Sequence, residues 1–217
     1  MSKIRMMGET RDVLANPRSF FENEIEEPSV RTPVLIVASL AVLGVLSAIV
    51  TYVELIGVMT GEARTVFAIL QMFNVIVAAV APFFIWILYA GVFYVMSIPL
   101  GGEGSFRNVI LLSAWGFIPR IAEGLLTLVA TIVALQLLEF NTVATQEEFS
   151  QVIQEIGFHT AALTANAIGI GLLLVSAYIW VGAMETARNL TRRNAVITVA
   201  VPVLLALAFR MLFPLLA

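Results

Sequence analysis

The chain of 217 residues has no cysteine and only one histidine, His159. It therefore cannot form a disulfide, a thiol nucleophile or a cysteine metal site, and one histidine is too few for a metal cluster or a catalytic triad. HExxH motifs and paired aspartates are also absent, so acid–base catalysis has no evident residues. We expect a non-enzymatic protein with no catalytic residues, no metal and no cofactor.

Charged residues are also few. Only 12% of the residues are charged and 60% are hydrophobic, whereas soluble domains carry about 25% charged residues. So few charges cannot cover a water-facing surface, and the apolar residues lie in long runs that indicate an integral membrane protein. The net charge of -3 gives no indication of nucleic-acid binding.

Five apolar runs predict an all-α fold, a bundle of five transmembrane helices in one domain over residues 33–217. The helices are expected at about 33–55, 66–98, 109–138, 161–184 and 195–216. Pro82 should kink the second helix, and Trp86, Tyr89 and Tyr94 resemble an aromatic belt. Pro119 should break the third into a half-helix or re-entrant piece over 109–118 and a span over 121–138.

Two short helices are expected outside the spans. Asn16 and Pro17 resemble an N-cap followed by proline at the first helical position, in a cytoplasmic N-terminal segment of residues 1–32. The helix that follows should lie on the bilayer or the bundle, and a partner-binding peptide is the alternative. Thr145 and Glu148 fit a capping box that begins an amphipathic extracytoplasmic helix, which should pack on the protein.

Basic residues predict the orientation. Nine of them fall in the N-terminal segment and in the loops after the second and fourth helices, whereas the opposite side has only Arg64. The positive-inside rule then gives a cytoplasmic N-terminus and an extracytoplasmic C-terminus in the cell membrane. The first 30 residues lack an apolar core segment, so we expect the first spanning helix to act as the insertion signal.

Charged residues inside the apolar runs are the candidate binding residues, because burying a charge in the membrane is costly. Arg120 and Glu123 lie three residues apart on one helical face and can pair. Such a pair could face inward as a site for an anionic headgroup or a proton path. The alternative, which we favour, places it at the cytoplasmic surface, where Arg120 extends to the headgroups.

A second candidate pair joins the first and fifth helices. Glu54 and Arg210 should both occupy the outer leaflet at similar depth, so the two helices could be neighbours with their charges paired. The alternative is that each side chain simply reaches the outer headgroups. At the cytoplasmic end of the fourth helix, Glu185 and Arg188 are expected to form a solvated salt bridge.

Four stretches together resemble the Yip1 domain proteins of prokaryotes. They are Pro17-Arg-Ser-Phe-Phe-Glu22, Gly101-Gly-Glu-Gly-Ser-Phe106, Leu112-Ser-Ala-Trp-Gly-Phe-Ile-Pro119 and Gly182-Ala-Met-Glu-Thr186. The resemblance implies five helices with a cytoplasmic N-terminus. Eukaryotic members bind prenylated GTPases, but their long N-terminal domain and Tyr-Gly-Pro-type motif are missing here, so that role is not carried over.

The expected function is a membrane-embedded scaffold or binding protein. Its expected partners are membrane lipids, with other membrane proteins or a second copy as further partners. The alternative is a small permease or channel subunit, which would need polar residues from several helices to converge on a wet cavity. The few polar residues within the spans favour the scaffold.

Topology reporters test the orientation directly. Fusions at residues 60 and 150 should report the extracytoplasmic side, and fusions at residues 104 and 190 the cytoplasmic side. An extracytoplasmic signal from residue 104 would contradict the five-helix arrangement.

Overall fold

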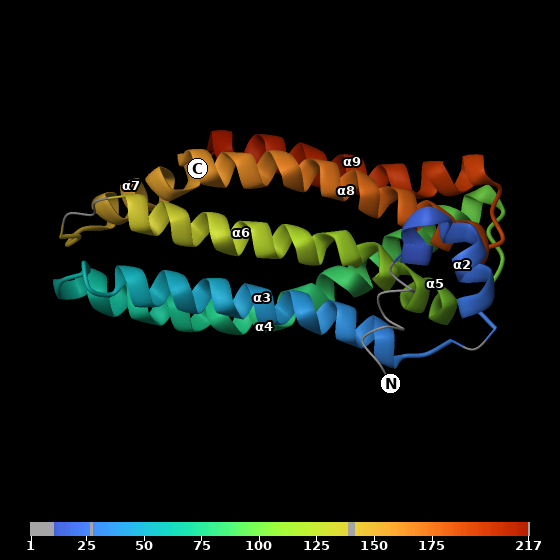
Figure 1. Ribbon diagram of the computed structural model, residues 1–217, viewed down its shortest axis with the longest axis horizontal. Helices are drawn as coiled ribbons and strands as arrows, with labels where there is room; N and C mark the ends of the chain where they lie inside the picture. Colours follow the sequence, from blue (N-terminus) through green and yellow to red (C-terminus); the bar gives the residue numbers. More distant parts are fainter. Residues whose placement is uncertain (1–10, 27, 139–141, 217) are drawn as a thin grey trace.

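The computed structural model describes residues 11–26, 28–138 and 142–216 as a bundle of long helices with short helices at both ends (Figure 1). Along the chain these are α2 (Pro17–Glu24), α3 (Arg31–Leu55), α4 (Gly61–Ser97), α5 (Phe106–Ser113), α6 (Ile118–Leu137), α7 (Gln146–Phe158), α8 (Thr160–Ala187) and α9 (Arg192–Leu216). Two 3₁₀ turns, η1 (Ile98–Leu100) and η2 (Ala114–Phe117), precede α5 and α6.

The long helices confirm the membrane character of the chain. Within the described residues, four segments are long and apolar enough to cross a bilayer, at Arg31–Leu55, Gly61–Leu100, Phe106–Leu137 and Thr160–Ala187. They coincide with the first four predicted spans. The predicted fifth span falls on α9, and a count of five crossings stays a prediction.

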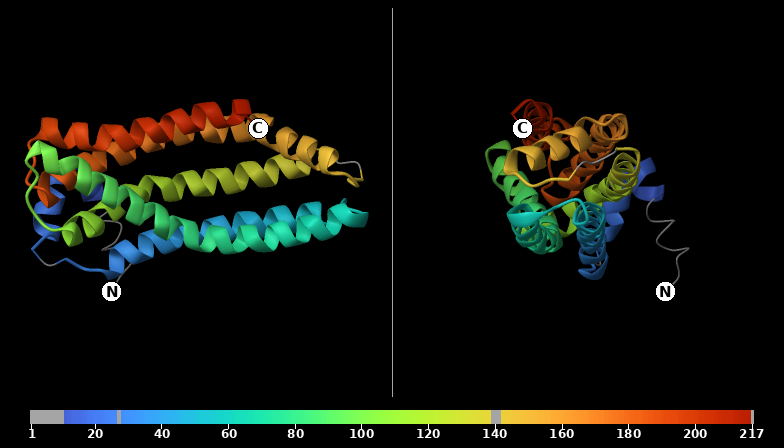
Figure 2. Two further views of the ribbon diagram at one scale, coloured as in Figure 1. Left: turned by 180° about the vertical axis from the view of Figure 1, so that it is seen from behind. Right: turned by 90° about the vertical axis from the view of Figure 1, so that its left-hand side faces the viewer.

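The helices pack as two groups joined through α6. α3 and α4 form a long hairpin, α6 lies against both α3 and α8, and α9 lies against α8 and α4. Figure 2 shows α3 and α9 on opposite sides of the bundle. The two ends of the bundle are here named the α2 end, which also holds α5, and the α7 end.

The third predicted helix is broken, as expected, but the break comes before Pro119. α5 ends at Ser113, η2 fills residues 114–117, and Pro119 occupies the first turn of α6, where its missing N–H is not needed. Two indole N–H groups hold the break, because Trp86 donates to the Ile110 carbonyl and Trp180 to the Ser113 carbonyl, each at 2.8 Å. These carbonyls belong to the last turn of α5, whose oxygens lack helical partners.

The second predicted helix is bent. α4 contains Pro82, and Figure 2 shows the helix changing direction in its middle. The aromatic belt expected on its second half is wrong: Trp86 is buried, Tyr89 packs 4.9 Å from the Trp180 ring, and Tyr94 lies under Arg188. These rings face the protein because the bend brings this half of α4 against α5 and α9.

The four stretches that carry the family resemblance meet at the α2 end. α2 lies on α8 with Pro17 and Phe21 buried, and the Phe20 ring contacts Trp115 of η2 at 4.7 Å. Glycine permits two of the contacts: a Cβ on Gly182 would lie 2.6 Å from Pro17, and one on Gly116 would lie 2.1 Å from the Trp180 indole nitrogen. The interpretation of α2 as a helix lying on the bundle is therefore confirmed.

Arg188 fastens the glycine-rich loop after η1 to the end of α8. Its guanidinium donates to the Ser97 hydroxyl at 2.8 Å and to the carbonyls of Gly102 and Gly104, while its Cζ lies 4.4 Å from the centroid of the Tyr94 ring. The residue is only 3% exposed. The expected solvated bridge between Arg188 and Glu185 is wrong, because the loop carbonyls surround the guanidinium instead.

The α7 end is closed by a capping box and an isolated bridge. Thr145 and Glu148 bond each other's backbone N–H groups, which confirms the predicted start of α7. Hydrogen bonds from the N–H groups of Ala144 and Thr145 lower the pKa of the Glu148 carboxyl below its usual range. A parallel bridge between Met59 and Val143 ties the preceding loop to the α3–α4 turn.

Replacing Arg188 by lysine should destabilise the α2 end, because an ammonium group cannot reproduce the planar fork that reaches the two carbonyls and the hydroxyl. We expect a loss of roughly 2–4 kcal/mol of unfolding free energy, from charged hydrogen bonds worth about 1.5–3 kcal/mol each. Thermal unfolding in a mild detergent measures it. Arg192→Lys, an exposed control, should shift the midpoint little, and equal shifts would contradict this role of Arg188.

Candidate functional site

The deepest charged cluster lies where α6 begins. Because α5 and η2 occupy the α2 end, α6 starts at Ile118 well inside the bundle, and its first two turns carry Arg120 and Glu123. The Glu123 carboxylate lies beside Gly169 of α8. Gly169 is roughly 27 Å along the helix from Ala187 and roughly 14 Å from Thr160, taking 1.5 Å per residue.

One carboxylate holds two guanidinium groups from different helices. Glu123 Oε2 lies 3.1 Å from Arg120 Nε, and Glu123 Oε1 forms an ion pair with Nη2 of Arg210 on α9. The Glu123 side chain is 10% exposed, compared with 30% for Arg120 and 20% for Arg210. A Cβ on Gly169 would lie 2.7 Å from Arg210 Nη1 and 2.8 Å from Glu123 Oε1, so a glycine is needed opposite the cluster.

The cluster has one positive charge in excess, because two guanidinium groups share one carboxylate. Arg210 Nη1 and Glu123 Oε2 are both buried and without a hydrogen-bond partner in the described part of the chain. The Tyr89 hydroxyl of α4 lies within electrostatic reach of both arginines. In a medium of low dielectric, an unbalanced charge attracts an anion much more strongly than it would in water. The site can therefore bind an anionic group.

Two hollows lie on either side of Glu123 and Thr127, and these two residues line both hollows. The first, named here the apolar groove, has a volume of about 350 Å³ and lies between α3, α4 and α6. Its lining is Leu40, Leu43, Gly44, Ser47, Pro82, Ile85, Phe117, Arg120, Glu123, Gly124 and Thr127. The second, named here the polar cavity, has about 260 Å³ between α6, α8 and α9, and it includes Thr131, Asn166 and Arg210.

The predicted pair of Arg120 and Glu123 is confirmed, but it lies within the bundle beside Gly169 rather than at the α2 end, and its depth relative to the membrane surface stays a prediction. The sequence placed the start of the span at Ile121 and hence at the interface. The structure instead uses residues 106–117 to fill the α2 end, so the start of α6 is displaced into the bundle. Glu123 then meets Arg210, which lies near the opposite end of its own helix.

The predicted pair of Glu54 and Arg210 is wrong. Glu54 is exposed near the end of α3, whereas Arg210 pairs with Glu123 of α6. The two helices are also not packed side by side, because α9 lies on α8 and α4. Similar depth in the membrane was the basis of the prediction, and depth alone does not say which helices are neighbours.

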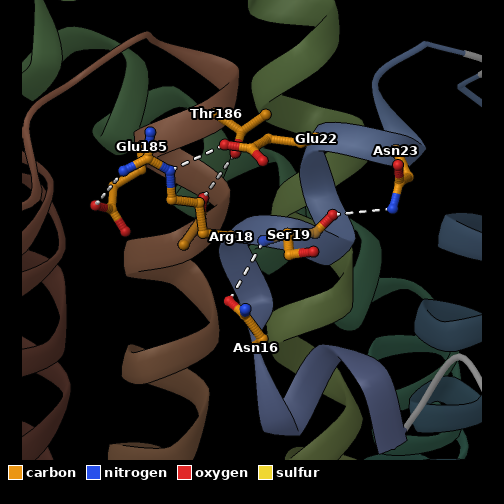
Figure 3. A network of polar contacts seen from close by, with 8 residues as sticks. Asn16, Arg18, Ser19, Glu22, Asn23, Glu185 and Thr186 are labelled. Atoms are coloured by element: carbon orange, nitrogen blue, oxygen red, sulfur yellow. Dashed lines mark hydrogen bonds and ion pairs between the residues drawn. The ribbon is translucent and has the colours of Figure 1, made fainter.

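A second polar network lies at the α2 end. Arg18 of α2 bonds Glu22 at 3.0 Å and lies 4.0 Å from Glu185 of α8, so it joins the two helices (Figure 3). Asn16 accepts a hydrogen bond from the Ser19 N–H, as an N-cap should. Arg18 and Glu22 are more than half exposed, so this network positions α2 and contributes little energy.

Sequence reasoning missed three contributors to the intramembrane site. Tyr89 was interpreted as part of a belt, and Gly169 only as a residue for close helix contact. Asn166 was interpreted as an amide that hydrogen-bonds between packed helices, but it lines the polar cavity. Gln71 performs that packing role elsewhere, donating from α4 to the Ala48 carbonyl of α3 at 3.2 Å. Among the described residues, no three His, Asp or Glu side chains are close enough to hold a metal ion.

Comparison with known proteins supports the family resemblance that the four stretches at the α2 end carry. The Yip1 domain model matches residues 11–213, nearly the whole chain. The chain belongs to the Yip1 domain family. This Yip1 protein is also 27% identical, over 118 residues, to an uncharacterized protein of the archaeon Methanocaldococcus jannaschii, a match that covers 54% of the chain and 84% of the relative. No solved structure matches it significantly.

Removing the shared carboxylate should be more harmful than removing one arginine. Glu123→Gln leaves two partly buried guanidinium groups without a counter-charge and should cost up to about 3 kcal/mol, the lower end of the range for broken buried pairs. Arg210→Gln leaves the neutral pair of Arg120 and Glu123 and should cost less. The double variant should recover part of the Glu123→Gln loss, as measured by unfolding in detergent. Additive losses would show that the two residues are not coupled.

Proposed function

We propose that this Yip1 protein is a non-enzymatic membrane protein that binds an anionic lipid at the cluster of Arg120, Glu123 and Arg210. The observation that carries the proposal is the excess positive charge at the buried cluster. Glu123 can neutralise only one of its two arginine partners, so one guanidinium charge is left to attract a ligand. Arg120 also lines the apolar groove, so its side chain is accessible from a hollow that hydrocarbon can occupy.

A lipid suits the surroundings of the site better than a soluble ion does. The groove is lined mainly by apolar side chains, and the described helices expose many large apolar residues toward the membrane. A soluble ion would have to lose its water to enter, whereas a lipid already lies beside the helices. Two arginines in a water-excluded site hold anionic oxygens through strong charged hydrogen bonds.

The proposed cellular setting follows from the charges along the sequence. With nine basic residues on its side, the α2 end faces the cytoplasm of the cell, and the α7 end faces outward. The bound lipid then lies closer to the outer surface. In this setting the protein acts as a scaffold whose intramembrane site recruits a charged lipid, and other membrane proteins or a second copy are its further partners.

Lipid analysis of the purified protein tests the proposal. Extracted in a mild detergent, the wild type should carry anionic lipid enriched over the bulk membrane, as measured by mass spectrometry. Arg210→Gln and Arg120→Gln each make the cluster neutral and should lower that enrichment roughly tenfold, the change that about 1.4 kcal/mol produces. Arg107→Gln removes the same charge from an exposed position and is the matched control.

Two results would overturn the proposal. One is a lipid content in the wild type that equals that of the bulk membrane. The other is an equal loss of anionic lipid from the Arg107→Gln and Arg210→Gln proteins. That result would show that lipid enrichment depends on total positive charge and not on the cluster. Flux of an anion through proteoliposomes that Arg210→Gln abolishes would instead assign the protein to the permeases.

A further inference from the structure

The apolar groove indicates which lipid the site takes. We propose, building on the function above, that the groove between α3, α4 and α6 holds the hydrocarbon tail of a fatty acid whose carboxylate lies against Arg120. The ligand enters sideways from the bilayer. Three features carry this inference: the apolar lining of the groove, its single charged region and the charge balance of the cluster.

The lining of the groove is largely apolar. Gly44 of α3 and Gly124 of α6 contribute no side chain to it, and a Cβ on Gly124 would lie 3.1 Å from Leu43. Apolar side chains from all three helices complete the wall, among them Leu40, Ile85 and Phe117. The two glycines let α3 approach α4 and α6 closely, since a Cβ on Gly44 would lie 3.3 Å from Ala78, and the apolar side chains of the wall are suited to contact with hydrocarbon.

Only one region of the groove is charged. Arg120 and Glu123 lie together on the first turns of α6, while Ser47 and Thr127 are the remaining polar residues. An occupant must therefore be polar at one end and apolar along the rest. A carboxylate suits a guanidinium, because its two oxygens can accept parallel hydrogen bonds. A phosphoglycerol headgroup would add further hydroxyl groups to a region with few partners for them.

The charge balance selects a single negative charge. Two guanidinium groups and one carboxylate leave an excess of one positive charge. One bound carboxylate makes the cluster neutral, whereas a zwitterionic lipid leaves the excess in place and a doubly charged phosphate reverses it. Neutral buried clusters are favoured over charged ones where water is excluded.

A photoreactive fatty acid with a diazirine in its tail tests the inference in nanodiscs of zwitterionic lipid. Crosslinks mapped by peptide mass spectrometry should fall on groove residues such as Leu40, Leu43 and Ile85. Ser47→Phe fills the groove and should reduce this labelling roughly fivefold or more. Ser39→Phe makes the same change at an exposed position on α3 outside the groove lining and should leave the labelling intact. Unlabelled fatty acid should compete better than phosphatidylglycerol.

The possible failures of the inference and of the proposed function differ. Labelling that depends on Arg120 and Arg210 but falls on α8 and α9 around the polar cavity would overturn the groove and leave anionic lipid binding standing. Stronger competition by phosphatidylglycerol would overturn the fatty acid as ligand. Labelling of the wild type that neither arginine variant reduces would overturn both. Size-exclusion profiles and unfolding midpoints like those of the wild type show that each variant is folded.

Discussion

The break between α5 and α6 is the feature on which the rest of the structure depends. Two tryptophan N–H groups bond carbonyls in the last turn of α5, so these two carbonyls keep partners where the chain leaves the helix in the protein interior. The break leaves α5 and η2 at the α2 end of the bundle. α6 therefore begins deep in the bundle, and the carboxylate reaches the arginine of α9.

The sequence predicted the helices well, because apolar runs, prolines and caps are local signals. Pro119 predicted the break, and the capping box of Thr145 and Glu148 predicted the start of α7. What it could not predict was which distant residues meet. Arg188 and Glu185 share one turn of helix, and only the packed loop carbonyls decide that Arg188 turns away from its neighbour. The partner of Arg210 likewise depends on the position of α6 in the bundle.

The stretches shared with the family and the charged cluster serve different purposes. The shared stretches form the α2 end, where glycine contacts, the aromatic rings and Arg188 fix α2, α5 and α8 to one another. The charged cluster lies further along the bundle and outside the four stretches, Arg120 following directly after the third. The helix break that positions Arg120 thus lies within the stretches that resemble the family, whereas the residues that line the two hollows, apart from Phe117, lie outside them.

The sharing of Glu123 by two arginines also bears on how the chain enters the membrane. Arg120 lies one turn from Glu123, so α6 can enter the bilayer as a helix whose charges already cancel. Arg210 is synthesised much later and has no acidic residue within its own helix. Its counter-charge comes from α6, so Arg210 gains a partner only when α9 packs into the bundle. The ion pair therefore couples the packing of α9 to that of α6, two helices that lie far apart in the sequence.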